Sequence, residues 1–343
     1  MSQRILVVDD SPFIRRILSD WIKSEPDMEL VGTANDGAEA IEKAKSLSPD
    51  LITMDVEMPG TDGLTALAEI MKTCPTAVLM VSSLTQVGAD ATIKALELGA
   101  YDFVGKPTGS TSIKIVSSRE EVMKKIRAGA KVKVSGAVTH PPKPTALRSA
   151  ATDKVVLIAS STGGPKALAS LWHMLPQGFN APILIVQHMP PGFTDSFAKR
   201  LNAIGTVPCR EAKAGDKITP GVALLAPGGF HMKVDHGHIV LNEDPNVHGT
   251  RPAADPLFFS AVKEYGNRLV AAILTGMGRD GAEGALAVRQ AGGRVFGQSE
   301  ESCTIYGMPK AAKSIGAVHG EFSIETMAEA ILSGLHGEVK RAS

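Results

Sequence analysis

One local pattern dominates this chain: a short apolar run, then a polar or glycine-rich corner, then a helix-like stretch. In the first third the runs are ILVV before Asp9 and Asp10, LITM before Asp55, AVLMV before Ser82, and YDFVG before Lys106. Runs of this length, rich in β-branched residues, are typical of buried strands in a parallel sheet. Because helix-like stretches separate them, the pattern predicts an α/β fold.

The pattern resumes at Lys154 and continues to the C-terminal region. The expected strands are VVLIAS, APILIV, VALLA, LVAAILTG and RVFGQ. The expected helices are PKALASLWHML, FTDSFAKRLN, DPLFFSAVKEY, GAEGALAVRQAG and IETMAEAILSGL, and HMKVDHGHIVLNE is expected to form a β-hairpin. Helices alternating with apolar strands predict a second doubly wound parallel-sheet domain.

Residues 131–153 interrupt the pattern. This segment holds three prolines and few large apolar residues, so it predicts a linker, semi-extended around His140. The last helix of the first domain is expected over residues 117–131. We therefore predict two doubly wound domains, at 1–130 and 154–343, joined by the linker.

The composition narrows the class of protein. Lys+Arg and Asp+Glu number 36 each, so the net charge is zero and argues against a nucleic-acid partner. No apolar stretch approaches the ~18–20 residues that span a bilayer, so we expect no membrane insertion. Cys74, Cys209 and Cys303 are odd in number and lack CxxC spacing, which favours structural thiols in a reducing compartment. We expect a cytoplasmic monomer.

The polar residues that follow the first-domain strands suit phosphoryl chemistry. Residues just past parallel strands converge on one sheet edge, where open α/β folds bind ligands. Three carboxylates there repel one another unless a cation neutralises them, and oxygen ligands favour Mg²⁺. A metal-bound carboxylate can attack a phosphoryl group, with Ser82 and Lys106 contacting its oxygens. The alternative for each residue alone is a cap or turn, and Asp10-Ser11-Pro12 resembles a helix start.

Three glycine-rich corners follow strands in the second domain, at residues 160–165, 187–192 and 275–281. If these strands are neighbours, Ser161, His188 and Asp280 meet at one edge. A serine becomes a nucleophile when a histidine removes its proton, and a carboxylate orients that histidine. The residues alone thus predict a serine hydrolase.

Other interpretations of these corners stay open at this level. The serine could be a turn residue, and Asp280 could cap the helix after it. STGGPK lacks the spacings of phosphate-binding loops, and Ser161 lacks a GxSxG setting. The group of Asp235, His236 and His238, and the lone Cys303, are weaker candidate sites because ligand spacing is missing.

Residues from Arg4 to about Ala128 resemble a response-regulator receiver domain. The matching pieces are ILVVDDSPFIRRIL, LITMDVEMPGTDGL, MVSS and GAYDFVGKP. The resemblance implies that Asp55 accepts the phosphoryl group. It further implies Mg²⁺ ligands (Asp10, Asp55 and the carbonyl of Glu57, with Asp9 acting through water), phosphoryl-sensing residues (Ser82 and Lys106) and a switch aromatic (Phe103).

Residues from about Lys154 to Leu335 resemble the catalytic domain of the chemotaxis protein-glutamate methylesterases (CheB family), which carry an N-terminal receiver. The motifs are ASSTGGPKAL, VQHMPPGFTDSFAKRL, LAPGGFHM, TRPAADPLF, LTGMGRDGAEG and YGMPKAA. The resemblance implies Ser161 as nucleophile, His188 as general base and acid, and Asp280 as orienting carboxylate. It also implies an oxyanion-binding amide at Met277, a site neighbour at Thr162 and a substrate contact at Arg251; Thr250 stands where some members have histidine.

The family resemblance implies a phosphorylation-controlled esterase. It would hydrolyse glutamate methyl esters on methyl-accepting chemoreceptors and deamidate particular receptor glutamines. A chemotaxis-type histidine kinase would supply phosphate, Mg²⁺ would serve the receiver, and the esterase would need no cofactor. The unphosphorylated receiver would block access to the active site. The alternative is a response regulator with a non-catalytic protein- or DNA-binding output.

Overall fold

The structure, a computed structural model, describes residues 2–83, 85–106, 112–130, 132 and 152–337. The chain divides into two compact units, Met1–Thr139 and His140–Ser343, and each is treated by itself. The predicted linker lies almost entirely outside the described residues, so its limits and those of the domains stay predictions. Within the described ranges, no helix is both long and apolar enough to cross a membrane.

The first unit is built on a five-stranded sheet. Every pair of neighbouring strands is parallel, in the order β2-β1-β3-β4-β5. The strands are β1 (Gln3–Val8), β2 (Met28–Ala34), β3 (Leu51–Asp55), β4 (Ala77–Ser82) and β5 (Asp102–Gly105). This order reverses direction at β1, and β1 and β3 flank the point where such folds bind ligands.

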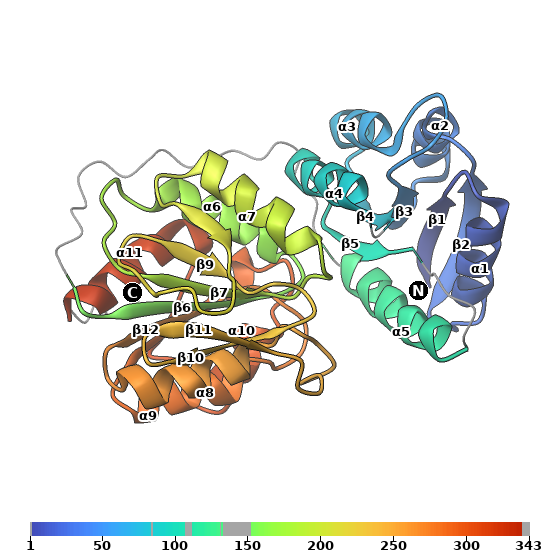
Figure 1. The fold of residues 1–343 in the computed structure, drawn as a ribbon. Coiled ribbons are helices and arrows are strands. Elements are labelled where there is room, and N and C mark those ends of the chain that lie inside the picture. Colours follow the sequence, from blue (N-terminus) through green and yellow to red (C-terminus); the bar gives the residue numbers. More distant parts are fainter. Residues whose placement is uncertain (1, 84, 107–111, 131, 133–151, 338–343) are drawn as a thin grey trace. The chain divides into compact units, whose positions relative to one another are not determined.

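Helices cover both faces of this sheet (Figure 1). They are α1 (Pro12–Lys23), α2 (Gly37–Leu47), α3 (Gly63–Thr73), α4 (Gln86–Leu98) and α5 (Ser112–Gly129). α1 and α5 lie on one face and α2, α3 and α4 on the other. α1 buries Ile14, Leu18 and Ile22, spaced four apart, against the sheet. The prediction for the last helix was wrong at its start, because α5 begins at Ser112 rather than at residue 117.

The second unit holds a seven-stranded sheet, again parallel throughout, in the order β14-β13-β12-β6-β7-β9-β8. The strands are β6 (Val155–Ser160), β7 (Ile183–Gln187), β8 (Cys209–Glu211), β9 (Ala223–Leu225), β12 (Leu269–Ile273), β13 (Arg294–Gln298) and β14 (Gly320–Phe322). The chain starts in the middle at β6, builds outward through β7, and returns to the other side at β12. The predicted fold class, two doubly wound parallel-sheet domains, is therefore confirmed.

The helices of the second unit also form two layers (Figure 1). They are α6 (Gly164–Met174), α7 (Phe193–Ile204), α8 (Ala254–Tyr265), α9 (Ala282–Gln290), α10 (Met308–Ser314) and α11 (Ile324–His336), with a 3-10 turn η1 (Glu300–Ser302). α6, α7 and α11 cover one face; α8, α9 and α10 cover the other. The expected hairpin is confirmed as β10 (His231–Asp235) and β11 (His238–Asn242), which turn at His236-Gly237 and pack against α8.

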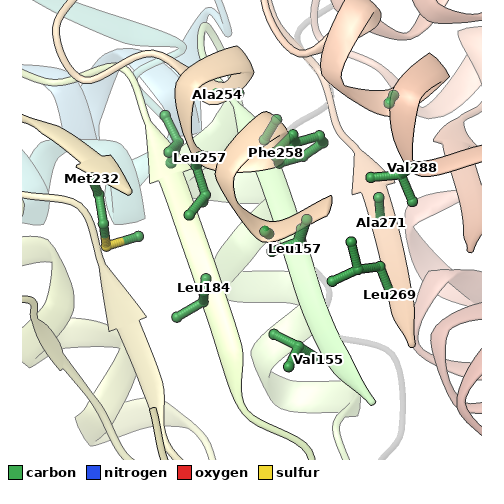
Figure 2. Packing of buried hydrophobic residues seen from close by; sticks show 14 of the residues in the cluster. Val155, Leu157, Leu184, Met232, Ala254, Leu257, Phe258, Leu269, Ala271 and Val288 are labelled. Carbon is green, nitrogen blue, oxygen red and sulfur yellow. The ribbon is translucent and has the colours of Figure 1, made fainter. Parts of the chain in front are cut away.

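Apolar packing fixes α8 over the middle of the sheet. Leu257 and Phe258 are fully buried on α8, and Figure 2 shows them above the strands that carry Leu157 and Leu184. Met232 of the hairpin belongs to the same cluster. This packing matters for the site because it places the first turn of α8 close to the ends of β6 and β12.

Candidate active site and candidate phosphorylation site

Two adjacent strands of the second unit, β6 and β7, bring Ser161 and His188 together. Ser160 pairs with Gln187 across β6 and β7, so the next residues, Ser161 and His188, leave the sheet side by side. The His188 N–H donates to the Ser160 carbonyl (3.1 Å). The convergence expected from the strand pattern is therefore present in the structure.

The corner at Ser161 is held by the side chain of Gln187. Its Nε2 donates to the Ser161 carbonyl (2.9 Å), and its Oε1 accepts from the Ser160 hydroxyl (2.7 Å). A Cβ added at Gly164 would lie 2.0 Å from that Oε1, so only glycine fits at this first position of α6. These contacts fix the serine corner against the neighbouring strand.

The third corner lies on the opposite side of Ser161. The Ser161 N–H donates to the Thr275 carbonyl (3.0 Å), and the Thr275 hydroxyl donates to the carbonyl of buried Thr162 (3.0 Å). A Cβ at Gly276 would come within 2.8 Å of the Ser161 Cβ. The backbone that leads into Met277 therefore lies against the serine, where an oxyanion-binding amide is needed.

Asp280 connects His188 to the start of α8. Its Oδ2 lies 2.7 Å from His188 Nε2 and accepts the Ala254 N–H (2.6 Å), while its Oδ1 accepts the Asp255 N–H (3.2 Å). Burial alone would raise the pKa of Asp280, but His188 and these two N–H donors lower it on balance. The carboxylate is thus held ionised beside the histidine.

The alternative that Asp280 caps the helix after it is wrong. α9 begins at Ala282, its N-cap residue is Gly281, and no side chain caps it; Asp280 instead accepts the first N–H groups of α8. Only the tertiary packing of α8 could reveal this role, because Ala254 lies 26 residues earlier.

The bond to Asp280 determines which nitrogen of His188 is available. Nε2 carries the proton that Asp280 accepts, so the lone pair lies on Nδ1. The Thr250 hydroxyl oxygen lies 3.4 Å from the same Nε2. Among the described residues no hydrogen bond joins Ser161 to His188, which is common in enzymes without bound substrate.

Arg251 fastens the loop that presents Thr250. Its Nη1 donates to the carbonyls of Glu243 (2.6 Å) and Asp244 (3.0 Å). Thr250 pairs with Val247 through backbone hydrogen bonds in both directions. The structure therefore places Arg251 as an anchor of this loop, and the predicted contact with substrate stays a prediction.

A second histidine–carboxylate pair, which the sequence did not single out, lies beside Asp280. His248 Nε2 is 2.9 Å from Asp255 Oδ2, and together with Asp280 these groups have the spacing of metal ligands. Because Asp280 already accepts three donors, the cluster suits fixed carboxylates better than an ion site. The motif TRPAAD contained Asp255, but nothing in the pattern marked it off from a helix cap.

The first unit gathers a different set at the ends of β1, β3 and β5. Lys106 Nζ lies 2.6 Å from Asp55 Oδ2 and 3.5 Å from Asp9 Oδ2. Burial raises the pKa of Asp55 to about 6, against the opposing effect of Lys106, and it also raises the pKa of Asp9. Burial would lower the pKa of Lys106, but the two carboxylates raise it on balance. One ammonium thus leaves these acids under-neutralised.

The under-neutralised acids fit a divalent cation. Asp9, Asp10 and Asp55 each offer an oxygen within 4.8 Å of the others, and Asp10 is exposed to incoming groups. Asp9 Oδ2 is buried and lacks a hydrogen-bond partner in the described part of the chain. Hard oxygen ligands with an excess of negative charge favour Mg²⁺. The Glu57 N–H bonds to Asp55, which brings this backbone to the site.

The predicted phosphoryl-sensing residue Ser82 and the predicted switch aromatic Phe103 lie on the neighbouring strands β4 and β5. Buried Ser82 donates from its hydroxyl to the carbonyls of Gly88 (3.2 Å) and Ser83 (3.3 Å). Phe103 points inward, 3% exposed, with Lys125 Nζ 5.3 Å from its ring centre and donating to its carbonyl (2.6 Å). Both side chains are therefore buried within the first unit.

The weaker candidates gain no support. Asp235 and His236 are exposed on the hairpin turn, 3.8 Å apart. Burial raises the pKa of the Cys303 thiol to about 12 and that of Cys209 likewise. Thiols with such pKa values stay protonated at neutral pH, as expected of structural residues.

Comparisons with known proteins agree with the geometry. The chain matches the family model for CheB methylesterase over residues 156–331, and the model for the response regulator receiver domain over residues 5–117. A protein-glutamate methylesterase/protein-glutamine glutaminase of Pyrococcus horikoshii is 44% identical, covering 97% of this chain and 93% of the relative. The protein of the same name from Thermotoga maritima is 46% identical, covering 90% and 91%.

A solved structure extends the similarity to three dimensions. The crystal structure of the Thermotoga maritima CheB methylesterase catalytic domain matches with a TM-score of 0.51 and 38% identity, covering 52% of this chain and 97% of that chain. Three observations point to the same family. They are the serine, histidine and carboxylate at neighbouring strand ends, the receiver-like acidic site, and the relatives matched along nearly their full length. The chain therefore belongs to the CheB methylesterase family and carries a response regulator receiver domain ahead of its methylesterase domain.

Proposed function

We propose that this protein is a protein-glutamate methylesterase and protein-glutamine glutaminase whose activity is controlled by phosphorylation. It acts on methyl-accepting chemoreceptors in the cytoplasm and serves adaptation in chemotaxis-type signalling. The observation that carries the proposal is the meeting of Ser161, His188 and Asp280 at adjacent strand ends, with 2.7 Å between His188 Nε2 and Asp280.

The first half of the reaction makes an acyl-enzyme. Ser161 Oγ attacks the ester carbonyl carbon while its proton moves to His188 Nδ1, the nitrogen left free by Asp280. The negative charge on the carbonyl oxygen is stabilised by the backbone amide of Met277. The carbon–oxygen bond to the methoxy group then breaks, and methanol leaves with the proton from His188.

The second half releases the receptor. Water loses a proton to His188 and attacks the acyl carbon, and Ser161 regains its proton as the free glutamate departs. A receptor glutamine enters the same path, with ammonia leaving in place of methanol. The charged Asp280 stabilises the imidazolium in both halves, because His188 and the α8 amides together hold the pKa of Asp280 low despite its burial.

The receiver accepts phosphate at Asp55 from a chemotaxis-type histidine kinase. Asp9, Asp10, Asp55 and the Glu57 carbonyl would hold Mg²⁺, which when bound neutralises charge on the phosphoryl oxygens. Lys106 and Ser82 then contact the phosphoryl group, and Phe103 follows the change at Ser82. The unphosphorylated receiver restrains the esterase, and phosphorylation relieves the restraint.

Methanol release from methylated receptor membranes tests the proposal. We expect release by the wild-type protein, faster with a small phosphodonor and Mg²⁺, and none above background with Ser161→Ala. Release by Ser161→Ala at the wild-type rate would refute the assignment of the nucleophile.

The alternative of a non-catalytic output is separated by covalent labelling. A fluorophosphonate probe labels a serine only where a base activates it. We expect labelling of Ser161 in the wild type and none in His188→Ala. Absence of labelling in both would favour a binding output.

A further inference from the structure

The pair His248–Asp255 stands directly behind the triad. Asp255 lies in the first turn of α8, and its N–H donates to Asp280 Oδ1 (3.2 Å) while its Oδ2 lies 2.9 Å from His248 Nε2. The ligating atoms of His248, Asp255 and Asp280 all fall within 4.8 Å of one another. Four groups thus form a row: His248, Asp255, Asp280 and His188.

Asp255 is fixed and almost sealed from water. Its side chain is 5% exposed, and its Oδ1 accepts the Gly284 N–H (2.7 Å) from the first turn of α9. The opposite end of the row is open, since the His248 side chain is 23% exposed on the loop before Thr250. Of the two side chains in this pair, His248 is therefore the one that faces solvent.

Two buried carboxylates this close are unfavourable unless something compensates them. Burial raises the pKa of Asp255, the Gly284 N–H lowers it, the charge of Asp280 raises it, and the bond from His248 lowers it; the net shift is upward. An asparagine would satisfy Gly284 equally well and carry no charge. A negative charge on Asp255 is thus electrostatically unfavourable at this buried position. His248 is the side chain that favours the ionised form of Asp255.

We propose that His248 and Asp255 form a positioning pair for the esterase reaction: His248 keeps Asp255 ionised, and Asp255 acts as a second carboxylate behind Asp280 that helps stabilise the His188 imidazolium. The pair touches neither substrate nor reacting atoms and works through Asp280. This inference rests on the proposed function. It adds His248 and Asp255 to the residues that set the basicity of the catalytic histidine.

The other titratable groups around α8 are already engaged or exposed. Buried His231 accepts the Ala253 N–H at Nδ1 (3.3 Å) and donates from Nε2 to the Pro245 carbonyl (3.1 Å), so both of its ring nitrogens are engaged. The remaining charged groups on α8, on the elements packed against it and next to Asp280 are Lys233, Asp235, Lys263, Glu264, Arg279, Glu283 and Arg289. Lys233 bonds to Asp244, Arg289 bonds to backbone carbonyls, and Glu283 and Arg279 are exposed. The groups in the row from His248 to His188 are therefore the ones expected to affect the titration of the His188 imidazole.

The hairpin turn offers a matched control. His236 and Asp235 form an exposed histidine–aspartate pair, 3.8 Å apart, in the same unit. His236 (φ 47°) and His248 (φ 53°) both adopt left-handed backbone conformations. Asparagine tolerates that conformation and is too short to replace the Nε2 contact. The test variants are thus Asp255→Asn and His248→Asn, and the controls are Asp235→Asn and His236→Asn.

The first readout is the titration of the His188 imidazole by NMR in the full-length Ser161→Ala protein, with the signal assigned by its loss in His188→Gln. Removing a nearby negative charge lowers the pKa of a histidine. We expect a downward shift of about 0.5–1 pH unit in Asp255→Asn and a smaller one in His248→Asn. The double variant should shift no further than Asp255→Asn, because His248 acts through Asp255. The two controls should not shift.

The second readout is the pH dependence of methanol release with Ser161 intact. The acidic limb of kcat/KM should move to lower pH by the same amount, with kcat reduced about tenfold and KM changed less than twofold. A merely structural role would lower the rate at every pH and leave the His188 titration unchanged, and that result would overturn the proposal. If Asp255→Asn fails to fold, His248→Asn on the exposed loop decides.

The outcomes separate this inference from the proposed function. Wild-type protein that releases no methanol and is not labelled at Ser161 would sink the proposed function. An active wild type, an inactive Ser161→Ala and an unmoved His188 titration in both test variants would sink the positioning pair alone.

Discussion

The receiver and the esterase domain each gather carboxylates at the carboxyl ends of parallel strands, yet they treat them in opposite ways. In the receiver, Asp9 and Asp55 share one ammonium, and burial raises the pKa of Asp55 to about 6. In the esterase domain, Asp280 accepts two helix N–H groups and bonds to His188, and its pKa is lowered. The same kind of sheet edge thus holds an under-compensated acidic site in the receiver and a compensated carboxylate in the esterase domain.

The difference follows from what each site has to bind. An under-compensated acidic cluster has a favourable interaction left to make with a cation. A carboxylate that already has its donors cannot rearrange, so it presents a fixed charge to the histidine. The α8 N-terminus supplies those donors. In the described part of the first unit, the Asp55 carboxylate bonds to Lys106 and to the Glu57 N–H instead.

The largest effect is expected at the nucleophile. Ser161→Ala removes the atom that forms the acyl-enzyme, so methanol release should fall by about 10⁴-fold or more, with the fold intact. Phosphorylation of Asp55 should be unchanged in this variant. Circular dichroism and intact mass after phosphodonor treatment are the controls. A decrease in methanol release of less than tenfold would contradict the assignment of Ser161, His188 and Asp280 as a catalytic triad.

Replacing the compensated carboxylate should reduce activity and stability together. Asp280→Ala removes the partner of His188 and the acceptor for two α8 N–H groups. Methanol release should fall by about 10³-fold, and the variant should lose about 1–3 kcal/mol in free energy of unfolding. Denaturant unfolding measures the second effect. Unchanged stability would mean that Asp280 does not hold α8.

Control by the receiver should give a smaller change in rate. A phosphodonor with Mg²⁺ should add one base-labile phosphoryl group to the wild type and raise methanol release by about 5- to 100-fold. Asp55→Asn should gain neither mass nor rate. A fragment starting near Thr152 should be faster than the unphosphorylated full-length chain and insensitive to the phosphodonor. Equal rates for both would show that the receiver does not restrain the esterase.

The smallest effect concerns the stability of the under-compensated site. Without Mg²⁺, the folded-state pKa of Asp55 near 6 exceeds the ordinary 3.8, so its charge costs stability fully above pH 6 and not below pH 4. Asp55→Asn should therefore stabilise the protein in EDTA at pH 8 by about 1–3 kcal/mol, a gain that disappears near pH 4. Thermal melts over this pH range measure it. Added Mg²⁺ should stabilise only the wild type. If Asp55→Asn were less stable than the wild type at pH 8 in EDTA, the Asp55 site would not be under-compensated.

Much of this architecture could be predicted from sequence, because its signals are local. Buried parallel strands are continuous apolar runs, so β1, β3, β4, β6, β7 and β12 stand out from their neighbours. Parallel strands align their carboxyl ends, so the residues after them were expected to meet. Ser161 and His188 do so through the register of Ser160 with Gln187.

The shortest elements were not predicted from the sequence, because a segment of three residues is too short to show a hydrophobic pattern. β8 and β14 are edge strands of three residues each, and α10 has seven. Their conformation depends on the strand or helix beside them, which lies elsewhere in the sequence. The start of α5, at Ser112, was placed five residues late, at residue 117.

The amino-acid sequence alone predicts which side chains reach the two sheet edges, because each buried strand is encoded as an apolar run of a few residues. How each carboxylate is compensated depends on contacts that form only when the domain packs. The packing of Leu257 and Phe258 brings the first turn of α8 to Asp280, and with it Asp255 and His248. Those contacts join residues 7 to 92 positions apart, and such non-local pairs are fixed by the packing of the whole domain rather than by any local preference.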